Sequence, residues 1–152
     1  MRIRLIKKTD DRHVLEAVRD DGSVASAEFE TRSTLRHDLM HYAVEQRAGL
    51  RSSLFGTIAA GAEPSTKMTS AAGEIQVTEV VVGMLQGAAA KDVDADAFVR
   101  EAHGWLALQG LALPAYLDAA FVRAVLAHYG RLLGQWQSLR RGGVLELQVS
   151  AE

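Results

Sequence analysis

The strongest hairpin signal of the chain lies in residues 13–30, HVLEAVRDDGSVASAEFE. In an extended chain over residues 13–19, Val14 and Val18 fall on one face and Leu15 and Ala17 on the other, which is the two-residue period of a strand. The tetrapeptide Asp20-Asp-Gly-Ser23 follows, and Asp-Gly is a residue pair that readily adopts a tight type I′ turn. A second strand then runs from Val24 to Glu30. We therefore expect an antiparallel hairpin of residues 13–19 and 24–30.

Both ends of the chain carry the same alternation. Near the N-terminus, Ile3 and Leu5 alternate with arginines, and near the C-terminus Leu145 and Leu147 alternate with polar residues. The closing strand needs a partner, and the strands at the start of the chain offer one. We therefore expect the last strand to pair with one of the first three.

The middle of the chain is predicted to be helical. The expected helices cover residues 33–49, 53–60, 74–90, 94–110 and 114–139, and residues 61–73 are expected to form a loop. Ser33 is predicted to cap the first helix, and Pro114 to stand in the first turn of the last one. Residues 74–90 also fit a strand, because Val77 and Val80 to Val82 are β-branched, but the length of the segment favours a helix.

These elements predict an α+β protein. Its antiparallel sheet has about four strands, three N-terminal and one C-terminal, with several helices packed on one face. The length of 152 residues fits a single domain that covers residues 1–152.

Composition excludes several classes of function. The chain has no cysteine, so disulfides, Cys-ligated zinc and a thiol nucleophile are excluded. The formal net charge of −2 lacks the basic excess of a phosphate-binding surface, so no nucleic-acid partner is expected. No apolar stretch reaches the roughly twenty residues of a membrane span, and charged residues interrupt the start of the chain before a signal peptide could form. We therefore expect no membrane partner and a cytoplasmic location.

One constellation indicates chemistry. The pentapeptide His37-Asp-Leu-Met-His41 places two histidines one turn apart on the same helical face, so both rings can reach one metal ion. It is similar to the HExxH zinc helix of metallopeptidases. The resemblance implies zinc as the cofactor, His37 and His41 as ligands, and Asp38 as the catalytic base for metal-bound water. Asp38 stands where that family has glutamate, and its side chain is one methylene shorter.

A third ligand must come from another element. His128 is the first candidate, because it projects from the apolar stripe of the last helix, and His103 is the second. Glu45 lies too far along the helix to share a metal ion with both histidines. It is predicted either to orient His41 through a hydrogen bond or to form a surface ion pair with Arg47 or Arg51. His37 and His41 are expected at the boundary of the core, and metal occupancy is expected to fall near pH 6.5.

Two functions of different classes follow. The first is a small non-enzymatic domain that binds a protein partner or forms a homo-oligomer, in which the histidines are structural. The second is a metal-binding protein, or a metal-dependent hydrolase, built on the helix of His37 and His41. Metal content after purification without a polyhistidine tag distinguishes the two.

Overall fold

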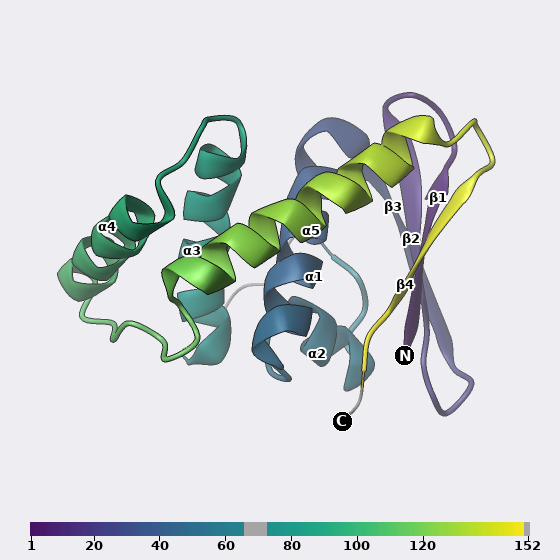
Figure 1. The fold of residues 1–152 in the computed structure, drawn as a ribbon. Helices are drawn as coiled ribbons and strands as arrows, with labels where there is room; N and C mark the ends of the chain where they lie inside the picture. The colour runs from purple at the N-terminus through teal and green to yellow at the C-terminus, as the bar shows by residue number, and fades with distance from the viewer. Residues whose placement is uncertain (66–72, 151–152) are drawn as a thin grey trace.

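The computed structural model describes residues 1–65 and 73–150 and has the predicted α+β fold (Figure 1). Four strands form one antiparallel sheet in the order β3-β2-β1-β4. The strands are β1 (Arg2–Lys7), β2 (Arg12–Val18), β3 (Val24–Glu30) and β4 (Val144–Gln148). The closing strand pairs with β1, one of the three N-terminal strands, as expected.

The register of the sheet separates an apolar face from a charged one. On the apolar face, Leu5 of β1 stands opposite Leu15 of β2 and Leu145 of β4, and all three are buried. On the other face, Arg4 stands opposite Glu16 and Glu146 and forms an ion pair with each. Cross-strand pairs of this kind fix the register, because a slip by one residue would expose the apolar set.

The turn between β2 and β3 differs from the type I′ turn predicted. Its loop has three residues, since the backbone N–H of Arg19 donates to the carbonyl of Ser23 and that of Gly22 donates back to the carbonyl of Arg19. Only Gly22 has a positive φ, +85°, whereas a type I′ turn needs two such residues. The Asp-Gly pair thus predicted the hairpin correctly but not its turn type.

The helices of residues 1–65 and 73–150 lie on one side of the sheet, with α3 and α4 farthest from the strands (Figure 1). A π-helical turn, η1 (Thr31–Leu35), leads into α1, and the other helices follow in chain order. They are α1 (Arg36–Ala48), α2 (Leu54–Ala59), α3 (Glu74–Ala89), α4 (Ala95–Leu108) and α5 (Ala119–Ser138). The ambiguous segment 74–90 is therefore helical. Helix α1 contacts α2, α3 and α5, and apolar side chains of the sheet and the helices form one buried cluster.

Two helix starts differ from those predicted. Glu30, not Ser33, caps the turn before α1, because its carboxylate accepts hydrogen bonds from the backbone N–H groups of Arg32 and Ser33. Pro114 stands before α5 and not in its first turn, since Asp118 caps that helix at the N–H of Phe121. In both cases the helical segment starts where a carboxylate side chain accepts hydrogen bonds from the free backbone N–H groups of the first turn.

Polar side chains fasten helices to the sheet. The guanidinium of Arg19 donates to the carbonyls of Ile58 and Ala62, which ties α2 and the following residues to the end of β2. The hydroxyl of Tyr42 on α1 donates to the carbonyl of Gln148 at the end of β4. These bonds fix α1 and α2 relative to the sheet.

No helix among residues 1–65 and 73–150 is long and apolar enough to cross a membrane. Residues 66–72, most of the predicted loop 61–73, lie outside the described residues.

Candidate metal centre

Helix α1 is enclosed by protein over most of its length. Every residue from Asp38 to Glu45 is buried, because α2, α3 and α5 pack against this stretch and its apolar side chains share one core cluster with the sheet. His41 is 0% exposed, which differs from the boundary position predicted for it. The side chain of His37, one turn earlier, is 37% exposed and does lie at a boundary. Burial leaves the imidazole of His41 dependent on protein partners for its polar atoms.

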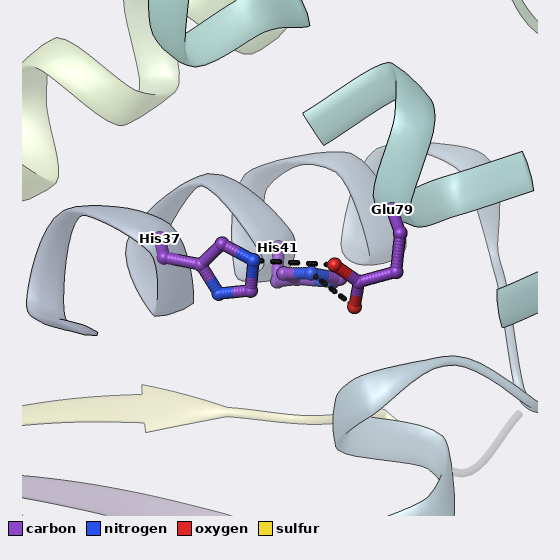
Figure 2. Close-up of side chains that lie close together, drawn as sticks. All are labelled: His37, His41 and Glu79. Carbon is purple, nitrogen blue, oxygen red and sulfur yellow. Dashed lines mark hydrogen bonds and ion pairs between the residues drawn. The ribbon is translucent and has the colours of Figure 1, made fainter. Parts of the chain in front are cut away.

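Glu79 of α3 faces both histidines (Figure 2). Its Oε2 lies 3.3 Å from Nε2 of His37, and its Oε1 lies 3.0 Å from Nε2 of His41. The ligand atoms of His37, His41 and Glu79 all lie within 4.8 Å of one another, a grouping that could hold a metal ion. The packing of α3 against α1 brings these residues together.

A second layer of carboxylates stands behind the two rings. Oε1 of Glu45 lies 3.0 Å from Nδ1 of His41, and Oδ1 of Asp38 lies 3.5 Å from Nδ1 of His37. Each ring therefore presents Nε2 to Glu79 and has an acidic partner near Nδ1. Metal-binding histidines have this arrangement, in which a carboxylate accepts the Nδ1 proton and leaves the Nε2 lone pair for the ion.

The group could hold a metal ion, and zinc provides a scale for the spacing of its ligand atoms. Ligand atoms around a tetrahedral zinc ion, at zinc–nitrogen distances near 2 Å, lie roughly 3.3 Å apart. The separations of 3.0 and 3.3 Å between the rings and Glu79 are close to that value, although they involve different oxygens of the carboxylate, and the three ligand atoms together lie within 4.8 Å of one another. Nε2 of His41 is also buried without a well-directed hydrogen bond from any described residue, although Glu79 is near it. A metal ion between these atoms would give that nitrogen a partner.

The protonation states of His37, His41 and Glu79 depend on one another. Interactions with Asp38 and Glu79 raise the pKa of His37 from 6.5 to about 9. Burial opposes the charged form of His41, but its contacts with Glu45 and Glu79 outweigh that effect and raise the pKa. The two rings in turn lower the pKa of Glu79 to about 2. Without metal, protons on the rings compensate the carboxylates, and a divalent cation would take over that role.

A cleft of about 630 Å³ reaches the group from outside. His37, Asp38 and Glu79 line it, and the side chains of His37 and Glu79 are each 37% exposed. His41 is closed off behind them. An ion held by the three residues would therefore have protein on the His41 side and the cleft on the other.

The remaining predicted residues occupy other places. His128 is half-buried on α5 with its ring 5.8 Å from that of Tyr42, and it is not part of the group. His103 is exposed on α4. Glu45 is buried and pairs with His41, the first of the two roles predicted for it. Asp38 lies near the Nδ1 edge of His37, a position suited to orienting that ring.

Glu79 is the residue that sequence reasoning missed. It stands on α3 between Thr78 and Val81, which are buried, so an acidic side chain interrupts an apolar surface. That interruption was the available signal, because an acidic residue beside a buried face requires a partner.

Comparison of the chain with protein-family models, with curated proteins and with solved structures finds no match.

Proposed function

We propose that this protein binds one divalent transition-metal ion, Zn²⁺, through Nε2 of His37, Nε2 of His41 and a carboxylate oxygen of Glu79. The observation that carries the proposal is the convergence of these three atoms, each histidine having a carboxylate near Nδ1. Two imidazoles and a carboxylate form a ligand set of zinc and also accommodate Fe²⁺.

The ligand count favours a reactive ion over a purely structural one. Structural zinc sites are closed by four protein ligands, whereas catalytic sites have three and keep a position for water or substrate. The described residues supply three ligands here, and the cleft adjoins His37 and Glu79. The open position would face the cleft, where the ion would polarise a bound group or lower the pKa of a bound water.

Zinc binding to protein without a polyhistidine tag tests the proposal. Protein freed of metal by a chelator is titrated with Zn²⁺ against a chromophoric competitor, and we expect one ion per chain. At a free zinc concentration a hundred times the Kd, the folded state gains about 2.7 kcal/mol, which raises Tm by about 5–10 °C. Absence of stoichiometric binding would remove the proposal.

Two variants locate the ion without opening the core. His37→Ala and Glu79→Gln change side chains that are 37% exposed, so the fold should persist while zinc affinity falls at least about a hundredfold. The double change His37→Ala, His41→Ala is less informative, because His41 is fully buried and its loss leaves a cavity. Glu101→Gln, on the exposed surface of α4, is the matched control and should bind zinc like the wild type. Equal affinity in the wild type and Glu79→Gln would contradict the site.

Self-association, the other function expected from the sequence, has one observation in its favour. Trp105 and Leu108 are 56% and 83% exposed and lie three residues apart, on the same side of α4. Sedimentation velocity of the wild type and of Leu108→Glu tests it, since a dimer formed through α4 would dissociate in the variant.

A further inference from the structure

We call His37, His41 and Glu79 the metal group. The cleft beside it is lined on one side by apolar residues, which form its floor. Leu15 and Phe29 come from the sheet, and Leu54 and Ile58 come from α2. All four residues are at most 8% exposed, so the floor is a surface of the packed core. A ligand that lies on it needs a hydrocarbon or aromatic body.

Two arginines line the same cleft. Arg32 belongs to the π-helical turn and Arg36 to the first turn of α1, and both are exposed. No ion pair or side-chain hydrogen bond within residues 1–65 and 73–150 involves either guanidinium. Arg4 and Arg12, by contrast, pair with glutamates across the sheet. Within the part of the chain that the structure describes, no partner competes for these two guanidinium groups. A guanidinium can bind a carboxylate through two parallel hydrogen bonds.

The net charge of the metal-loaded cleft favours a ligand that carries a single negative charge. A divalent ion with Asp38, Glu45 and Glu79 as carboxylates leaves a formal charge of −1 at the metal group. Arg32 and Arg36 then bring the metal-loaded cleft to +1. A monoanion neutralises this charge, whereas a phosphate dianion exceeds it.

We propose that the cleft binds a small organic carboxylate whose anionic group pairs with Arg32 and Arg36 and whose apolar body lies on Leu15, Phe29, Leu54 and Ile58, beside the metal ion. The inference rests on the metal site proposed above and adds the chemical class of its ligand. It makes the ion a neighbour of the bound molecule, so a polar group on that molecule can occupy the open coordination position.

Calorimetric titration of the zinc-loaded protein with 4-phenylbutyrate tests this class. We expect one molecule per chain, with 4-phenylbutanamide and acetate each binding at least about tenfold more weakly, because the first lacks the charge and the second lacks the apolar body. Inorganic phosphate should also bind more weakly. Equal affinity for the carboxylate and the amide, or stronger binding of phosphate, would overturn the inference.

Arginine variants locate the anionic group. Arg36→Gln and Arg32→Gln should each weaken 4-phenylbutyrate binding about tenfold while zinc affinity stays unchanged. Arg47→Gln is the matched control, since Arg47 is exposed on the same helix but does not line the cleft. Wild-type affinity in both cleft variants would overturn the role of the arginines.

The zinc titration separates the two proposals. A protein that fails to bind zinc contradicts the metal site and this inference together. A protein that binds zinc through His37 and Glu79 but does not distinguish 4-phenylbutyrate from its amide contradicts only the inference.

Discussion

Glu45 and His41 form a buried pair in which Oε1 of the carboxylate lies 3.0 Å from Nδ1 of the ring. The other carboxylate oxygen accepts a hydrogen bond from the backbone N–H of Phe55 at 2.9 Å. One carboxylate therefore fixes the ring on α1 and the first turn of α2. A neutral amide has only one oxygen and cannot accept from both donors.

Glu45→Gln should weaken zinc binding about 10- to 100-fold and lower the free energy of unfolding by about 1–3 kcal/mol. If the amide oxygen stays on Phe55, its NH₂ group faces Nδ1 of His41 and drives the ring proton to Nε2, the atom that must bind the ion. Competitive zinc titration and urea denaturation measure the two effects.

Glu74→Gln is the control for this change. Oε1 of Glu74 also accepts two backbone N–H bonds, from Arg51 and Ser52, but it touches neither histidine. Its replacement should leave zinc affinity within about twofold of the wild type. Similar losses of zinc affinity in the two variants would show that Glu45 acts through general stability and not through His41.

His128→Ala should leave the zinc response intact. The ring of His128 packs 5.8 Å from that of Tyr42, and no ligand atom of the metal group belongs to it. The expected cost is about 1 kcal/mol of unfolding free energy, the size of an aromatic contact. Thermal denaturation with and without Zn²⁺ measures both quantities, and loss of the zinc-induced rise in Tm would make His128 a ligand after all.

The parts of the fold that are encoded locally were predictable. Alternation at Ile3 and Leu5 predicted β1, and Asp21-Gly22 predicted the hairpin of β2 and β3, because both signals lie within a few residues. The spacing of His37 and His41 was equally local, since one helical turn sets it.

Glu79, the third residue of the group, could not be predicted in the same way. Glu79 lies 42 positions beyond His37, and their contact depends on how α3 packs against α1. The pattern of apolar residues on α1 was also misleading, because a helix buried on all sides has no single core-facing stripe. His128 lies on such a stripe of α5, but the stripe does not reveal which face of α1 it packs against.

Zinc binding should release at least one proton per ion at pH 7.5. Interactions with Asp38 and Glu79 raise the pKa of His37 to about 9, so the metal-free ring is protonated at that pH and the ion must displace the proton. Apparent affinity should therefore rise about tenfold per pH unit between pH 6.5 and 8.5, a range above the value near 6.5 expected for an ordinary histidine. Calorimetry in buffers of different ionisation enthalpy counts the protons, and a pH-independent affinity would contradict this coupling.

His13 should make the protein less stable in acid. Its ring is fully buried between Phe29 and Trp136, with Nδ1 3.1 Å from the hydroxyl of Thr31 and Nε2 without a hydrogen-bond partner among the described residues. Burial lowers the pKa of His13 below 6.5, so the unfolded chain binds a proton that the folded protein resists. This contribution to stability is complete above pH 6.5 and is lost as the pH falls through the lowered pKa.

His13→Leu removes that titration while keeping an apolar side chain of similar reach. The free energy of unfolding should decrease less between pH 7.5 and pH 5 in the variant than in the wild type, as measured by urea denaturation of metal-free protein. The histidines of the metal group act in the opposite direction, since their raised pKa values add stability as the pH falls toward 6.5. That contribution is common to both proteins and cancels in the comparison. An equal pH dependence in the wild type and His13→Leu would show that the buried ring accepts a proton without opening the core.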